Sequence, residues 1–163
     1  MESEKQLKIY ENMNFYNRYE RLSEKYQLEN RFENYANENV IALYQELGYK
    51  AKHIKKNNFF KIEEKIENIK FYFHTCLKYG NTELIMGASD MEKNEFLLGG
   101  PFAHISKEIE ILKNIEKEGY IRSPKFSNYE DLYEILKVTL HIYEDFKREV
   151  LKLSSKEVKF LKI

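Results

Sequence analysis

The apolar residues of this chain follow two different periods, and the change between them decides the fold class. From Phe60 to Ile66 and from Ile69 to Leu77, apolar and polar residues alternate, as in β-strands with one buried face. Glu67-Asn68 between these runs is a turn candidate, so they predict a β-hairpin. Before Gly48 and after Pro124, by contrast, apolar residues recur at helical spacing. We therefore predict an α+β fold.

Two further strands are predicted after this hairpin. Gly80-Asn81 supplies the next turn, and the run from Glu83 to Met91 follows it. One face of that run carries Leu84, Met86 and Ala88. The run from Phe96 to Phe102 is apolar enough for a short fourth strand, although its two glycines and one proline would soon end the pairing. The prediction is an antiparallel sheet of three to four strands.

Two helices are predicted before the sheet and two after it. The N-terminal pair covers residues 7–26 and 28–47, with a break near Leu28 and a C-terminal cap at Gly48. The third helix is predicted from about Ser106 to Glu118, where Gly119 would end it. The last begins at a capping box formed by Ser127 and Glu130 and continues to Leu151. We expect the two C-terminal helices to pack on the sheet, in a single domain of residues 1–163.

Charge and cysteine content exclude several classes of function. The 27 basic and 27 acidic residues cancel, so no global field attracts the chain to nucleic acid or to an anionic membrane. There is neither a signal peptide nor an apolar run of the roughly 18–20 residues that a membrane helix needs, so a cytoplasmic location is expected. The single cysteine, Cys76, excludes an internal disulfide and a multi-cysteine zinc site.

Two local patterns are candidates for chemistry. His74 and Cys76 lie two apart on a predicted strand, so they would share a face and could form a nucleophile or metal pair. The run lacks a third ligand and an orienting carboxylate, which favours a structural role. Gly99-Gly100 could expose backbone N–H groups to an anion, but no Lys-Ser or Lys-Thr follows, which favours a tight turn or bulge. We expect no catalytic residue, metal or cofactor, and no enzyme activity.

A basic segment with two aromatic residues offers an alternative function. The cluster consists of Lys50, Lys52, His53, Lys55 and Lys56, followed by Phe59 and Phe60. Cations beside stacking rings are what single-stranded nucleic acids require. The neutral total charge and the place of Phe60 in the apolar alternation argue against it. A small nucleic-acid-binding regulator remains the alternative, and a small hydrolase using His74 and Cys76 is less favoured still.

Two strings in the second half of the chain resemble a known group of binding proteins. They are Leu98-Gly99-Gly100-Pro101-Phe102, which closes the predicted sheet, and Pro124-x-Phe126-Ser127-Asn128-Tyr129-Glu130-Asp131-Leu132, which opens the last helix. With the order of elements from Ile69 to Leu151, they look like immunity proteins of bacterial polymorphic toxin systems, namely contact-dependent growth inhibition and neisserial Maf-type systems with EndoU-like nuclease toxins. The resemblance implies a cytoplasmic toxin inhibitor that binds its cognate toxin domain and blocks its active site or its access to substrate.

The resemblance also implies an acidic surface that meets the toxin, because a nuclease domain is basic where it engages phosphates. Residues 81–121 hold eight acidic and four basic side chains, a net charge of −4. Aromatic anchors are expected beside them, because tyrosine is enriched at interfaces. The predicted partner-binding residues are Tyr72, Tyr79, Glu83, Asp90, Glu92, Glu95, Glu116 and Glu118.

Overall fold

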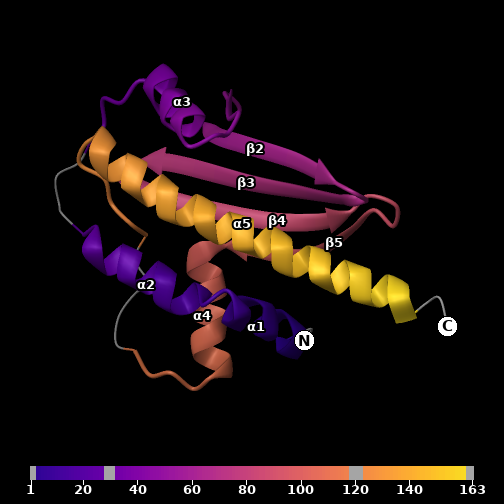
Figure 1. The fold of residues 1–163 in the computed structure, drawn as a ribbon. Helices are drawn as coiled ribbons and strands as arrows, with labels where there is room; N and C mark the ends of the chain where they lie inside the picture. Colours follow the sequence, from indigo (N-terminus) through magenta and orange to yellow (C-terminus); the bar gives the residue numbers. More distant parts are fainter. Residues whose placement is uncertain (1–2, 28–31, 118–122, 161–163) are drawn as a thin grey trace.

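The sheet consists of five antiparallel strands that follow one another in the order of the sequence. The computed structural model of the chain describes residues 3–27, 32–117 and 123–160 (Figure 1). The strands are β1 (Lys52–Ile54), β2 (Phe59–Ile66), β3 (Ile69–Lys78), β4 (Asn81–Asp90) and β5 (Glu95–Pro101). Each strand therefore pairs with its neighbours along the chain, and Asn81 at the start of β4 also bridges to Lys125.

The alternation that predicts the strands also predicts which sheet face is buried. Thr75 pairs with Phe60 on β2 and with Leu84 on β4, and Phe73 pairs in the same way with Ile62 and Met86. All six side chains of these two rows are at most 3% exposed. The β2–β3 hairpin turns at Glu67-Asn68, as predicted, with Glu67 in the left-handed region at a φ of 55°.

All described helices lie on this one face of the sheet (Figure 1). They are α1 (Ser3–Asn12), α2 (Phe15–Lys25), α3 (Asn37–Glu46), α4 (Phe102–Leu112) and α5 (Tyr129–Phe160). Helix α5 crosses the sheet from one end to the other, while α1, α2 and α4 pack together beside it (Figure 1). The opposite face of the sheet carries no described helix, and we call it the open face.

Aromatic rings join the helices to the sheet. Phe102 at the start of α4 lies with its ring centroid 5.2 Å from that of Phe15 and 5.5 Å from that of Tyr19, both on α2. On the sheet, Phe73 contacts Phe102 and Tyr143 with centroids 6.1 and 5.4 Å apart. All five side chains are at most 1% exposed. Each buried ring of this size contributes a large apolar area to the core.

The α+β class and the antiparallel sheet are confirmed, but the described part of the chain has one strand more than the upper prediction. The added strand is β1, whose three residues fall inside the predicted basic cluster. The predicted helix over residues 7–26 is two helices, since Asn14 adopts a φ of 51° between them. The predicted helix over residues 28–47 begins only at Asn37. Residues 28–31 of that prediction lie outside the described residues.

The C-terminal helices also begin and end at other residues than predicted. Helix α4 begins at Phe102 instead of Ser106, directly after Pro101, and ends at Leu112. Asn114, at a φ of 52°, allows Ile115 N to donate to Glu110 O, which closes the helix. Glu118 and Gly119 lie outside the described residues. The N-cap of α5 is Asn128, whose Oδ1 accepts from Asp131 N at 2.8 Å, so the predicted capping pair is shifted by one residue.

Candidate functional site

One end of the sheet carries an acidic surface built from two neighbouring turns. Met91 N, in the β4–β5 turn, donates to Asn68 O in the β2–β3 turn at 2.8 Å, which holds the turns side by side. We call this surface the acidic tip, and its charged residues are Glu67, Asp90, Glu92, Lys93 and Glu95. Four acidic and one basic side chain give it a net charge of −3. Three of the eight predicted partner-binding residues, Asp90, Glu92 and Glu95, are thus brought together, and Glu67 is added.

Two large apolar side chains are exposed at the acidic tip. Phe96, at the start of β5, is 59% exposed, and Met91 in the adjoining turn is 39% exposed. The turn beneath them is ordered, because Asp90 Oδ1 accepts from Glu92 N at 2.9 Å and from Lys93 N at 3.1 Å. Exposed aromatic and methionine side chains inside a charged rim are typical of protein interfaces.

The structure does not bring the other predicted residues to this tip. Tyr79 and Glu83 lie near the start of β4, and the seven steps along the strand from Glu83 to Asp90 span roughly 23 Å. Tyr72 lies in the middle of β3 on the open face, and Glu116 is exposed after the end of α4. The seven predicted residues that the structure describes therefore do not form one continuous surface, and Glu118 lies outside the described residues.

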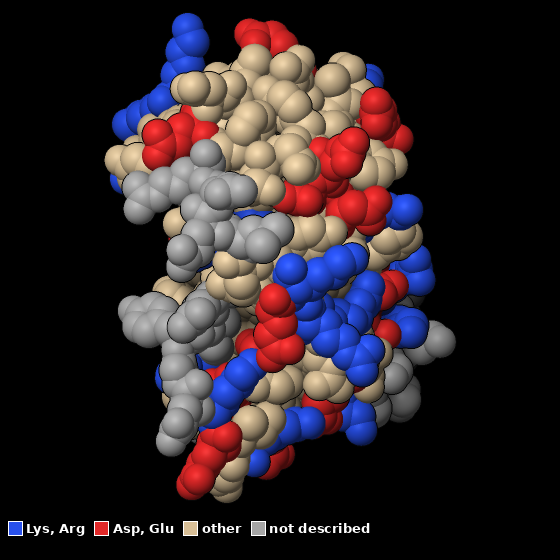
Figure 2. All heavy atoms as spheres, turned by 90° about the vertical axis from the view of Figure 1, so that its left-hand side faces the viewer, with Lys and Arg blue, Asp and Glu red and all other residues tan. Residues whose placement is uncertain are grey.

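The end of the sheet opposite the acidic tip contains a cleft of about 1060 Å³. Its lining includes Tyr79 and Glu83 from the predicted set, together with Cys76, His104 and Lys125. Figure 2 faces this end and shows basic and acidic side chains close together, without one sign prevailing. A uniformly acidic docking surface is therefore not formed here.

Cys76 lies in this cleft but is not prepared for nucleophilic chemistry. Burial raises the pKa of its thiol above the ordinary value, and the charge of Glu83 on the neighbouring strand raises it further. A thiol with a raised pKa is a weak nucleophile at neutral pH, because the reactive species is the thiolate. The geometry supports the structural reading of Cys76.

His74 shares the open face with Cys76, as predicted, and is packed between two rings. Its ring centroid lies 4.7 Å from that of Phe59 and 5.0 Å from that of Tyr72. Burial lowers the pKa of His74, and Lys61 lowers it further. Nε2 of His74 is buried and has no hydrogen-bond partner among the described residues. No group of three His, Cys, Asp or Glu side chains that could hold a metal occurs in the described ranges.

Tyr72 lies across the sheet over a glycine of the neighbouring strand. Gly87 is its cross-strand partner, and a Cβ added to Gly87 would lie 2.2 Å from the ring Cζ and the hydroxyl oxygen of Tyr72. The ring therefore rests on the sheet surface with one face inward and remains half-buried. Lys78 pairs with Asn81, so the turn lies at Tyr79-Gly80, one residue before the predicted Gly80-Asn81. Sequence reasoning missed the contact of Tyr72 with Gly87, which depends on this register.

Two lysines of the open face, Lys61 and Lys70, form ion pairs with the carboxylate of Glu63. Glu63 Oε2 lies 2.6 Å from Lys61 Nζ, and Glu63 Oε1 lies 3.3 Å from Lys70 Nζ. The hydrogen bond from Lys61 lowers the pKa of Glu63, although partial burial acts in the opposite direction. Glu63 therefore remains charged at neutral pH and forms ion pairs with both Lys61 and Lys70.

The backbone structure explains the two adjacent glycines, Gly99 and Gly100. Gly99 has a φ of 128°, and a Cβ there would lie 2.2 Å from Met86 O on β4. The register shift between Ala88 and Ser89 lies beside it, in keeping with the predicted bulge. The backbone at Gly99 is thus packed against β4 and does not form an open anion loop.

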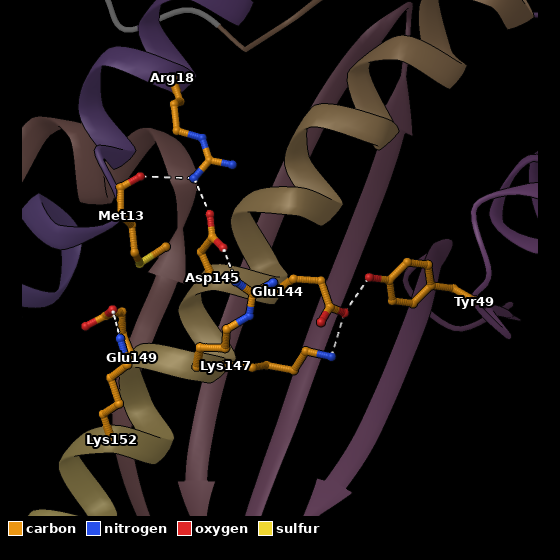
Figure 3. Close-up of polar contacts among 9 residues, drawn as sticks. Met13, Arg18, Tyr49, Glu144, Asp145, Lys147, Glu149 and Lys152 are labelled. Carbon is orange, nitrogen blue, oxygen red and sulfur yellow. Dashed lines mark hydrogen bonds and ion pairs between the residues drawn. The ribbon is translucent and has the colours of Figure 1, made fainter.

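A third polar cluster lies where α5 crosses the sheet (Figure 3). Lys147, only 6% exposed, contacts Glu144 at 2.7 Å and Glu64 at 3.0 Å. The hydroxyl of Tyr49 donates to the same Glu144 carboxylate at 2.5 Å. The next residue of α5, Asp145, pairs with Arg18 of α2 at 2.7 Å (Figure 3). These contacts attach α5 to β2, to α2 and to the segment before β1, so their role is structural.

Comparison of the chain with protein-family models, with curated proteins and with solved structures finds no match. None of the described helices is both long and apolar enough to cross a membrane. The function is therefore argued from the surfaces above.

Proposed function

We propose that this chain is an immunity protein, which acts in the cytoplasm, without enzymatic activity, by binding and neutralising a cognate toxin domain. The observation that carries the proposal is the acidic tip, where residues with a net charge of −3 lie near the exposed side chains of Met91 and Phe96 in the sequence. The resemblance of the strings at Leu98 and at Pro124 to immunity proteins supports the same function.

The acidic tip is suited to a toxin that acts on nucleic acid. Such a toxin presents Lys and Arg side chains to phosphates, and the carboxylates of Glu67, Glu92 and Glu95 would occupy those side chains instead. Complementary charge accelerates association, while burial of Phe96 and Met91 slows dissociation. The toxin would thus be blocked at the surface with which it binds its substrate.

Co-expression with the toxin encoded beside this chain tests the function directly. We expect the wild-type chain to restore growth and to co-purify with the toxin domain. If the toxin kills equally well in its presence, the immunity function is excluded.

A charge reversal tests whether the acidic tip is the binding surface. Glu92→Lys with Glu95→Lys changes the charge of the tip from −3 to +1, since each substitution adds two charges. Because charge steering changes association rates by about 10- to 1000-fold, we expect toxin association to slow at least about tenfold at low salt and to lose most of its salt dependence. Stopped-flow association at several salt concentrations measures both.

The matched control places the same charge change at the other end of the molecule. Glu46 on α3 and Glu134 near the start of α5 are exposed, and both lie away from the acidic tip (Figure 1). We expect Glu46→Lys with Glu134→Lys to leave the association rate within about threefold of wild type. Equal slowing by both double variants would mean that total charge, and not the tip, guides binding.

A further inference from the structure

The open face of the sheet carries a charge that the neutral total conceals. The alternation of β1 to β4 places five lysines on this face, and only two carboxylates accompany them, a net charge of +3. The lysines are Lys52, Lys61, Lys65, Lys70 and Lys78, and the carboxylates are Glu63 and Glu83. A positive surface of this kind attracts a polyanion even though the chain as a whole is neutral.

Three rings pack against one another within this positive surface, with His74 between Phe59 and Tyr72. The centroids of Phe59 and Tyr72 lie 4.7 and 5.0 Å from that of His74, and all three side chains are half-buried. Tyr72 lies on the sheet over Gly87 and is half-buried, so part of its ring remains accessible to solvent. Flat rings on an open antiparallel sheet are surfaces on which unpaired bases can stack.

We propose that the open face binds single-stranded nucleic acid, with bases stacked on the accessible sides of Tyr72 and Phe59, which flank His74, and with phosphates on Lys61, Lys65 and Lys70. The lysines supply the charge complementarity, and the rings select single strands, because a duplex keeps its base faces stacked internally. An acidic protein would satisfy the lysines but would leave the rings without stacking partners. This site adjoins the acidic tip, because Lys65 and Lys70 share a cross-strand row with Ser89 and Phe96. It does not depend on the proposed immunity function.

Glu63 limits the affinity of this site. Its carboxylate holds Lys61 at 2.6 Å and Lys70 at 3.3 Å, so a phosphate must displace it or share the lysines with it. Removing the charge of Glu63 therefore frees two cations without changing the rings. A substitution that strengthens binding is a sharper test than a loss, since misfolding cannot produce it.

Fluorescence anisotropy with labelled oligouridine and oligothymidine of about ten nucleotides, at about 50 mM and 200 mM salt, measures the binding. We expect the wild-type chain to bind both single strands more tightly than a duplex of the same length, and more weakly at the higher salt. We expect Tyr72→Ala to weaken binding about tenfold and Tyr72→Phe to keep it within about twofold, because the phenyl ring still stacks. Circular dichroism confirms that each variant is folded.

The experiment also includes Glu63→Gln, which is expected to tighten binding, and a matched control variant. We expect Glu63→Gln to tighten binding at least about threefold at low salt, while Glu134→Gln, the same charge change on α5, leaves it unchanged. The proposal is overturned if the wild-type chain binds no single strand at low salt, or if it binds the duplex or a decaglutamate peptide as tightly. It is equally overturned if Glu63→Gln and Tyr72→Ala both leave affinity unchanged. The tip variants Glu92→Lys and Glu95→Lys should not weaken oligonucleotide binding, so this site and the toxin surface can fail separately.

Discussion

Replacing Lys147 by methionine tests the buried ion cluster of α5. Methionine keeps most of the length of the side chain but leaves Glu64 and Glu144 without their shared cation, which now lies 3.0 and 2.7 Å from them. Removing one partner of a buried pair costs about 3–5 kcal/mol. The two carboxylates are 32% and 36% exposed, so water reduces this cost. We expect a loss of about 2 kcal/mol in the free energy of unfolding at pH 7.

The loss should depend on pH in a definite direction. Burial acts to raise the pKa of Glu144, but hydrogen bonds from Lys147 and Tyr49 hold it below the ordinary value of 4.5. A lowered folded-state pKa stabilises the protein above the unfolded pKa, and this stabilisation disappears as the pH falls through the folded value. Without Lys147 burial prevails, and the carboxyl accepts a proton more readily in the folded state. The difference between variant and wild type should therefore shrink as the pH falls from about 7 to about 4.

Urea unfolding followed by circular dichroism at several pH values measures this difference. At pH 7 the expected loss corresponds to a fall in Tm of about 4–8 °C for a chain of this size. Lys113→Met is the control, because Lys113 pairs with Glu11 at 2.8 Å while both side chains are more than 40% exposed, and it should cost less than about 0.5 kcal/mol. A Lys147→Met loss below about 0.5 kcal/mol, or one of equal size at both ends of the pH range, would refute the reasoning.

Two other variants probe the open face. Gly87→Ala places a Cβ within 2.2 Å of the Tyr72 ring and is expected to cost about 1–3 kcal/mol. Combined with Tyr72→Ala it should cost at least about 1 kcal/mol less than the sum of the single losses; additive losses in urea unfolding would show that the ring does not rest on Gly87. Cys76 should react with iodoacetamide at neutral pH more slowly than a free cysteine, because burial and Glu83 raise its pKa. Glu83→Gln should accelerate the reaction, and a native rate above that of free cysteine would instead indicate an activated thiol.

The buried side of the sheet is readable from the sequence because each strand with one covered face repeats its pattern every second residue. Phe71, Phe73 and Thr75 are all 0% exposed, as the alternation predicts. β1 was not predicted, because three residues are too few to show an alternation of apolar and polar side chains. Two of them, Lys52 and His53, also belong to a run that looks like a solvated basic segment.

The acidic tip and the open face are harder to predict from the sequence, since each depends on contacts between residues that are far apart in the chain. The acidic tip joins Glu67 to residues more than 20 positions later, through a hydrogen bond between two turns. The contact of Tyr72 with Gly87 requires the register of β3 and β4. The helix ends near Asn14 and Asn114 were predicted wrongly for a local reason. Both asparagines adopt the left-handed conformation that is usually expected of glycine.

The sequential order of the strands has a consequence for how the chain folds during synthesis. Every strand pairs with the next one along the chain, so the sheet needs only local loop closures and can form as it is made. Its covering helix, α5, begins at Tyr129, after every strand has been completed. Until then the inner row from Ile62 through Phe73 to Met86 has no α5 to shield it from water. The nascent chain therefore exposes its most aggregation-prone surface for the time needed to translate the residues between Pro101 and the end of α5.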